Sequence, residues 1–129
     1  MTGQVHGLNY LKQNDYAGAE PFWRERLRIL DRMNPDDWRT FNSKSMLGAS
    51  LLGQKKYADA EPLLVAGYEG MREREARIAV PNRTRLTGAL ERIVQLYDAW
   101  GKKDQADERR KRLAARREAD QKPEIPDEK

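Results

Sequence analysis

Apolar residues recur along the chain at the spacing of amphipathic helices. The clearest case is residues 36–77, where apolar positions in 46–52 and again in 60–71 follow an i, i+3, i+4, i+7 rhythm. The rhythm breaks at residues 53–56, which predicts two helices joined by a short turn. No segment alternates apolar and polar residues as a half-buried strand would. We therefore expect an all-α protein.

A repeated heptapeptide divides the chain into similar units. The residues that begin at Tyr16 read YAGAEPF, and those that begin at Tyr57 read YADAEPL, 41 positions later. A third copy, displaced by 46 positions, aligns Ala106 with Ala60 but lacks the tyrosine and the Glu-Pro pair. A fixed period of this length is typical of repeat architectures. The prediction is three antiparallel helical hairpins, in repeats at about 1–34, 36–77 and 82–117.

Local signals place the ends of some of these helices. Residues 34–37, Asn-Pro-Asp-Asp, predict the end of one helix and the cap of the next. Pro21 and Pro62 would each remove a backbone hydrogen bond inside a helix, at a typical cost of about 3 kcal/mol. Helices that begin near Tyr16 and Tyr57 put these prolines near the first turn, which reduces that cost.

Small residues occupy equivalent sites in the first two repeats. Gly48 and Ala60, and likewise Gly7 and Ala19, fall where the two helices of a hairpin are expected to approach most closely. A larger side chain at such a site would push the helices apart. Each repeat is therefore predicted to be a tightly packed hairpin that stacks on the next.

On these residues the chain resembles the tetratricopeptide repeat family. The motif positions of the second repeat are Leu47, Gly48, Leu51, Ala60, Leu64 and Gly67. The 41-residue period and the Tyr-Ala-x-Ala-Glu-Pro-Leu sequence are similar to the longer kinesin light chain type, which in bacteria often follows kinase or nucleotide-hydrolysing signalling domains. The resemblance implies a short right-handed solenoid over residues 1–117. Residues 118–129, which are acidic and contain two prolines, are expected to form a disordered charged tail.

The resemblance also implies a binding surface. In such arrays the first helix of each hairpin lines a concave face, which binds an extended peptide or a helix of a partner. The corresponding groove positions in this sequence are Gln4, Leu8, Leu11 and Lys12 in the first repeat, Asn42, Ser45, Ala49 and Leu52 in the second, and Glu91, Gln95 and Asp98 in the third.

Composition narrows the class of protein. The chain has 129 residues, of which 36% are charged and 38% apolar, so a single domain with a thin core is expected. It has no cysteine and no apolar run of the roughly 18 residues that cross a bilayer, and its first residues lack the pattern of a signal peptide. We expect a cytoplasmic protein with no membrane partner.

The residues of a thiolate or multi-histidine site are missing. His6 is the only histidine, so with no cysteine the chain lacks the ligands of a zinc site and a catalytic histidine set. Residues 48–55 are similar to a phosphate-binding loop, but Gln54 stands where lysine is required and the segment lies in a predicted helix. We therefore expect a non-enzymatic scaffold that binds a protein or peptide partner and uses no cofactor.

A basic run near the C-terminus leaves a second function open. Residues 109–112 read Arg-Arg-Lys-Arg, and Arg116 and Arg117 follow about one turn later. Clustered cations of this kind bind nucleic acid or another acidic surface. The same charges are typical of the polar outer face of a terminal helix, and no aromatic residue lies among them to stack on bases, which disfavours nucleic acid. Self-association through the apolar ends of the repeat stack is a third alternative.

Overall fold

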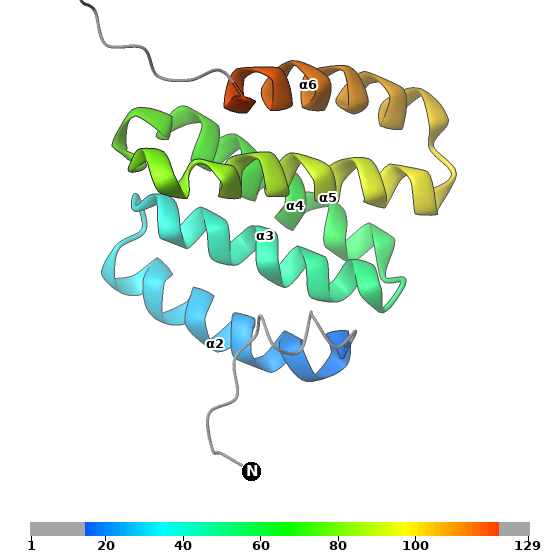
Figure 1. Ribbon diagram of the computed structural model, residues 1–129. Helices are drawn as coiled ribbons and strands as arrows, with labels where there is room; N and C mark the ends of the chain where they lie inside the picture. The colour runs from blue at the N-terminus through cyan, green and yellow to red at the C-terminus, as the bar shows by residue number, and fades with distance from the viewer. Residues whose placement is uncertain (1–14, 122–129) are drawn as a thin grey trace, which may run out of the picture.

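The computed structural model describes residues 15–121, and all the regular secondary structure in that range is helical (Figure 1). The helices are α2 (Tyr16–Met33), α3 (Trp38–Gly53), α4 (Tyr57–Glu73), α5 (Thr84–Trp100) and α6 (Lys103–Gln121), with short 3-10 turns at Glu75–Arg77 and Val80–Asn82. The expectation of an all-α chain is confirmed over this range. The first helix predicted for the first repeat falls in residues 1–14, outside the described range.

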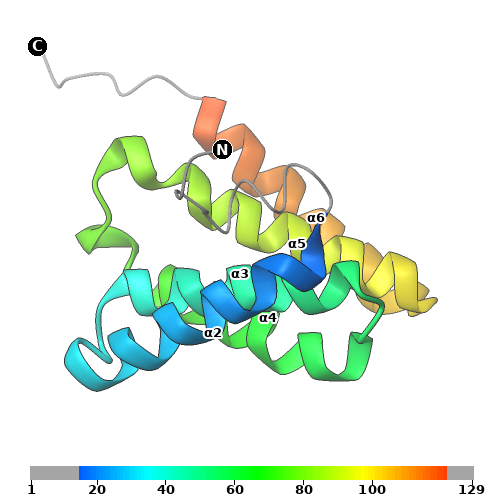
Figure 2. The same cartoon turned by 90° about the horizontal axis from the view of Figure 1, so that it is seen from below.

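Helices that follow one another in the chain pack against each other. Contacts join α2 to α3, α3 to α4, α4 to α5 and α5 to α6 (Figures 1 and 2). Helix α3 also contacts α5, so these two lie side by side although α4 separates them in sequence; in Figure 1, α4 lies behind both. Residues 36–77 contain α3 and α4, as predicted, and α5 fills the first half of the third predicted repeat.

The last helix is longer than the sequence predicts. Helix α6 continues to Gln121, so residues 118–121, which were assigned to a disordered tail, are helical. One side-chain interaction holds this end against the rest of the molecule: the hydroxyl of Thr87 on α5 donates a hydrogen bond to Asp120. Within α6, Arg116 forms an ion pair with the same carboxylate one turn away. The remainder of the predicted tail, residues 122–129, lies outside the described range.

The two proline-containing helices begin where the heptapeptide predicts. Helix α2 begins at Tyr16 and α4 begins at Tyr57. Pro21 and Pro62 are the sixth residues of these helices, and both are exposed. Each proline leaves one backbone carbonyl four residues earlier without its helical donor. Because both prolines are on the solvent side, water can reach the freed carbonyl and lower the cost.

Small residues allow α3 and α4 to approach closely. A Cβ atom on Gly67 would lie 2.7 Å from the Phe41 carbonyl oxygen and 2.7 Å from the Ser45 nitrogen, so backbone meets backbone at this point. A Cβ on Gly48 would lie 2.7 Å from Cγ of Leu64. The sequence predicts that Gly48 lies against Ala60. In the structure the atoms nearest to a Cβ on Gly48 belong to Leu64, which is one turn further along α4.

The core has two parts of unequal size. The larger part joins α3, α4, α5 and α6, and its fully buried side chains include Leu64, Leu90 and Ile93. The smaller part joins α2 to α3 through Ala19, Trp23, Met46 and Leu47. Helix α2 therefore packs on α3 through a small apolar cluster of its own, separate from the main core.

Candidate functional site

The two copies of the heptapeptide make equivalent contacts with the helix that follows. Glu20 on α2 accepts a 2.9 Å hydrogen bond from the Gln54 side chain just after α3, and Glu61 on α4 accepts a 2.8 Å hydrogen bond from the Tyr97 hydroxyl on α5. The hydrogen bond from Gln54 is the largest cause that holds the pKa of Glu20 below its ordinary value. Burial, followed by the bond to Glu61, raises the pKa of Tyr97 to about 12. The glutamate of each heptapeptide thus accepts a hydrogen bond from a side chain at or near the end of the following helix.

The tyrosines of the heptapeptides also occupy equivalent places. A Cβ atom on Gly53, the last residue of α3, would overlap the ring of Tyr16. The ring of Tyr57 lies 6.0 Å from that of Trp100, the last residue of α5. Each tyrosine therefore contacts the last turn of the following helix. The two heptapeptide tyrosines therefore make similar contacts.

Helices α3 and α5 together form the surface on which the predicted binding residues fall. One row of α3 and one row of α5, at helical spacing, define what we term the α3–α5 face: Asn42, Ser45, Ala49 and Leu52 with Gly88, Arg92 and Gln95. A hydrogen bond crosses this face, donated by Nη1 of Arg92 to Oγ of Ser45 at 3.1 Å. The two residues are 47 positions apart, so the contact depends on the packing of α3 against α5.

The predicted groove residues of α3 differ in exposure. Asn42 and Leu52 are half-buried and present part of their side chains at the surface. Ser45 is fully buried and Ala49 is nearly so, because α5 packs on α3 at this point. These two were predicted to contact a partner, and in this structure they form the floor of the face instead. The groove residues predicted for the first repeat, Gln4, Leu8, Leu11 and Lys12, lie outside the described residues.

The predicted groove residues of α5 do not all lie on the α3–α5 face. Gln95 is exposed and three positions from Arg92, on the α3–α5 face. Glu91 and Asp98 instead form ion pairs with arginines of α6, at 2.6 Å to Arg117 and 2.9 Å to Arg110. Their carboxylates are therefore engaged by the last helix, and a partner on the α3–α5 face would have to compete for them.

Arg92 is a feature of this face that the sequence analysis missed. Its side chain is half-buried, and burial lowers the pKa of its guanidinium. No carboxylate among residues 15–121 forms an ion pair with it, and within that range its guanidinium donates a hydrogen bond to the Ser45 hydroxyl. A Cβ on Gly88, one turn earlier, would lie 3.7 Å from Nη2 of Arg92, so the glycine leaves space beside the guanidinium. This Gly-x-x-x-Arg spacing on one helix face is the signal that could have found the site.

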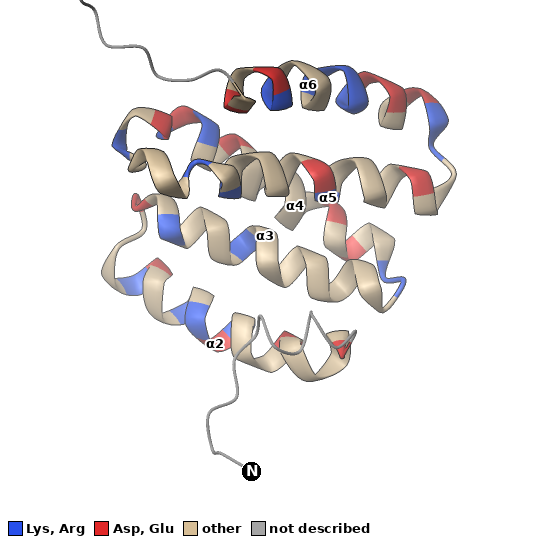
Figure 3. Ribbon diagram, viewed as in Figure 1, with Lys and Arg blue, Asp and Glu red and all other residues tan. Residues whose placement is uncertain are grey.

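The basic run on α6 is largely neutralised by the protein itself. Figure 3 shows acidic and basic positions interspersed along this helix. The ion pairs of its arginines are Arg110 with Asp98, Arg112 with Glu108, Arg116 with Glu75 and Arg117 with Glu91. These contacts are those of a terminal helix with a polar outer face. They count against a polyanion-binding role for this helix.

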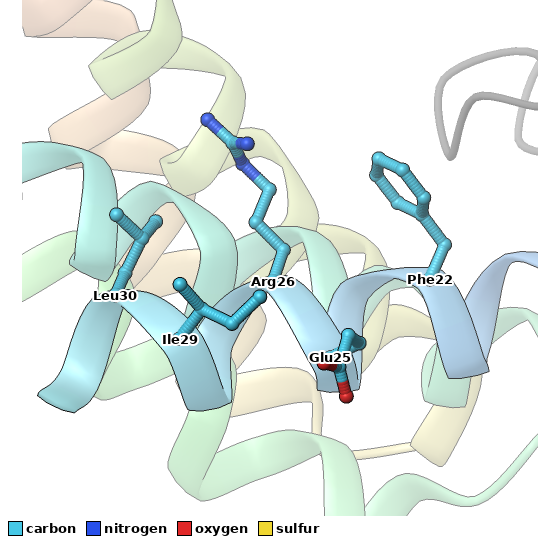
Figure 4. A pocket seen from close by; sticks show the side chains of 5 residues that line it. All are labelled: Phe22, Glu25, Arg26, Ile29 and Leu30. Atoms are coloured by element: carbon cyan, nitrogen blue, oxygen red, sulfur yellow. The ribbon is translucent and has the colours of Figure 1, made fainter. Parts of the chain in front are cut away.

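Helix α2 carries an open hollow lined by Phe22, Glu25, Arg26, Ile29 and Leu30 (Figure 4). In this view Phe22, Arg26 and Leu30 project from one side of the helix, whereas Glu25 points away from them. Ile29 is 42% exposed and is one of the few large apolar side chains at the surface of the described residues. Self-association through such an end of the stack stays a prediction.

Comparisons with protein-family models, with curated proteins and with solved structures give no match to this chain. Over residues 15–121, no helix is both long enough and apolar enough to cross a membrane. The same residues contain no cluster of three or more histidine, aspartate or glutamate side chains that could hold a metal ion.

Proposed function

We propose that the chain is a non-enzymatic protein-interaction scaffold of the tetratricopeptide type, with kinesin light chain-like repeats stacked into a short right-handed solenoid. Its partner is a protein that presents an extended peptide or a helix to the α3–α5 face, and it acts in the cytoplasm. The equivalent contacts of Glu20 and Glu61, and of Tyr16 and Tyr57, support this repeat arrangement.

The direct contact between α3 and α5 carries the proposal. Stacked repeats that bring equivalent helices side by side form a continuous surface suited to an extended ligand. On this face Asn42 and Gln95 offer side-chain amides, each of which both donates and accepts hydrogen bonds, as a peptide backbone requires. Leu52 offers apolar contact beside them. The combination of amides and apolar surface favours a peptide over a small metabolite.

A peptide-display experiment tests this function. Random dodecapeptides would be selected on the full chain, and the affinity of the enriched peptides would be measured for Asn42→Ala and Gln95→Ala. Each substitution should weaken binding about fivefold, since a hydrogen bond is worth about 1 kcal/mol. Gln105→Ala is the matched control, because Gln105 is an exposed amide on α6. Absence of enriched peptides, or an equal loss in the control, contradicts the proposal.

A further inference from the structure

The turns that follow α3 and α5 lie at the same end of the molecule and bring lysines beside a pair of aromatic rings (Figure 3). Lys55 and Lys56 belong to the first turn, and Lys102 belongs to the second. The ring of Tyr57 lies 6.0 Å from that of Trp100, and the Lys102 ammonium lies 4.1 Å from the centre of the Trp100 ring. Both aromatic side chains are half-buried, so part of each can be reached from solvent.

An open hollow of about 350 Å³ lies at this point. It is lined by Lys55, Lys56, Tyr57, Ala58, Asp59 and Trp100. Lys102 is not among the lining residues, so its ammonium leaves part of the Trp100 indole facing the hollow. Among the described residues Lys55 forms no ion pair, and the ammonium of Lys56 has only a long contact of 3.9 Å with Glu20. The hollow is large enough for a small ligand, and its lysine charges are free to bind one.

The lining of the hollow differs from the equivalent place in the first repeat. Aligned on the two heptapeptides, the differing pairs are Asn14 with Lys55, Asp15 with Lys56 and Gly18 with Asp59. The first heptapeptide tyrosine contacts a glycine, Gly53, at the end of the following helix, whereas the second contacts Trp100. The packing of the tyrosine on the next helix therefore requires neither an indole nor neighbouring lysines.

The two lysines also occupy backbone positions that favour other residues. Lys55 has a φ of 64°, in the left-handed region where glycine is preferred, and Gly101 has a φ of 76° at the aligned position after α5. Asp15 caps α2 by accepting a 3.0 Å hydrogen bond from the Gly18 nitrogen, whereas Lys56 makes no side-chain cap at α4. Residues that break a local rule of the fold in this way point to a function.

We infer that this hollow binds a nucleotide, whose base stacks on the Trp100 indole and whose phosphate pairs with Lys55 and Lys56. Aromatic side chains hold bases by stacking, and ammonium groups form charge-assisted hydrogen bonds with phosphate. Asp59 disfavours a simple polyanion, but its carboxylate can accept a hydrogen bond from the amino group of a base. The inference goes beyond the proposed function, because the hollow lies at the turns and not on the α3–α5 face.

Titration calorimetry on the full chain tests the inference with ATP and with inorganic tripolyphosphate. ATP should bind at least about tenfold more tightly, because stacking of the base adds to the pairing of the phosphates. Trp100→Leu should remove this difference. Trp38→Leu is the matched control, since Trp38 is also a half-buried indole beneath a cation but lies at the opposite end of α3. It should leave the ATP affinity unchanged.

The lysines are tested by substitutions that favour the fold. Lys55→Gly relieves the left-handed backbone and Lys56→Asn supplies a capping side chain, so each should keep or raise the melting temperature. Each should nevertheless weaken ATP binding about tenfold, through loss of a charge-assisted contact with phosphate. Lys111→Gln removes an exposed lysine of α6 and should change neither quantity.

The contact with the edge of the base is tested with ITP, which has an oxygen where ATP has its amino group. Wild type should prefer ATP about fivefold, the value of one hydrogen bond. Asp59→Ala should lose this preference while it keeps the difference between ATP and tripolyphosphate. A preference that survives in Asp59→Ala overturns the part assigned to this carboxylate.

Several results would overturn the nucleotide site. These are equal affinities for ATP and tripolyphosphate, an equal loss in Trp100→Leu and Trp38→Leu, or a lower melting temperature in both lysine variants, which would give the lysines a structural role.

Single-stranded hexaadenylate distinguishes two sources of the same chemistry. Binding much tighter than that of ATP assigns the hollow to a nucleic acid strand, and equal binding assigns it to a free nucleotide; both results support the site. Peptides selected on the α3–α5 face should bind Trp100→Leu as they bind wild type, so the failure of one proposal leaves the other standing.

Discussion

The Tyr97 hydroxyl on α5 donates a 2.8 Å hydrogen bond to the Glu61 carboxylate on α4, and Glu20, at the same position of the first heptapeptide, accepts a hydrogen bond from Gln54. Tyr97 is only 5% exposed, so this bond forms at the edge of the core that joins the two hairpins. Burial and the neighbouring carboxylate both oppose ionisation of the tyrosine and raise its pKa to about 12. The interface between the hairpins therefore depends on a protonated Tyr97.

This dependence predicts a loss of stability at alkaline pH. The folded-state pKa of Tyr97 lies above the ordinary value of 10.0, so its contribution is fully present below pH 10.0 and is lost as the pH rises toward about 12. The loss should amount to about 1–3 kcal/mol in the free energy of unfolding. Urea denaturation across this range should show a smaller decline for Tyr97→Phe than for wild type. Parallel declines would mean that Tyr97 does not titrate as a buried group.

Overpacking should distinguish the two faces of α4. Ala60 is fully buried in the main core, whereas Ala58, two positions earlier, is exposed. Ala60→Leu should therefore lower the free energy of unfolding by about 1–3 kcal/mol, because extra methylene groups strain a well-packed site. Ala58→Leu adds the same atoms on the solvent side and should have little effect. Equal shifts in the urea midpoint would show that the contact face of the hairpin is wrongly assigned.

Glycine-to-alanine substitutions should have opposite effects at two helical sites. At Gly67 the added Cβ would meet the backbone of α3 at 2.7 Å, so Gly67→Ala should destabilise the protein by separating α3 and α4. A Cβ atom added at Gly88 would lie 3.7 Å from its nearest neighbour, Nη2 of the flexible Arg92 side chain. Gly88→Ala should stabilise by up to about 1 kcal/mol, the difference in helix propensity. Thermal denaturation of the two variants checks the signs.

Acid should weaken the attachment of α6. The hydrogen-bonded Arg116 guanidinium holds the pKa of Glu75 below its ordinary value of 4.5. The contribution of this pair to stability is therefore present above pH 4.5 and is lost as the pH falls through the lowered pKa. Glu75→Gln should cost about 1–2 kcal/mol at neutral pH and remove part of this acid dependence. Glu25→Gln breaks an exposed ion pair within α2. This control should change neither the stability at neutral pH nor the dependence of stability on acid.

Much of the fold follows from local sequence. The heptapeptides predict where α2 and α4 begin, because a proline is tolerated best near the start of a helix. The apolar rhythm predicts α3, α4 and α5 in the same way. The end of α6 could not be predicted, since residues 118–121 are polar and the hydrogen bond that Asp120 accepts from Thr87 on α5 forms only in the folded chain.

The candidate face was predicted less well than the helices. The family positions were identified from spacing along the sequence. Spacing alone is enough to place Asn42 and Gln95 on the rows of α3 and α5 that form the face. Spacing alone cannot tell that Glu91 and Asp98 pair with arginines of α6, because those contacts depend on how α6 lies against α5. Arg92 was missed for the same reason: its significance comes from an environment built by two helices, which no motif position records.

The last prediction separates the α3–α5 face from the basic run of α6 as the binding surface. With a partner that the scaffold binds, Asn42→Ala should reduce affinity by about 1 kcal/mol through loss of an amide hydrogen bond. Lys12→Ala, in the part of the predicted groove outside the described residues, should do the same.

Replacing Arg109, Arg110 and Arg112 together with glutamine should leave that affinity nearly unchanged. Arg110 and Arg112 already have carboxylate partners on α5 and α6, and at physiological salt exposed charges are screened beyond about 8 Å. Titration calorimetry with each variant gives the comparison. If the triple arginine variant loses binding while Asn42→Ala keeps it, the partner docks on the basic run of α6 rather than on the α3–α5 face.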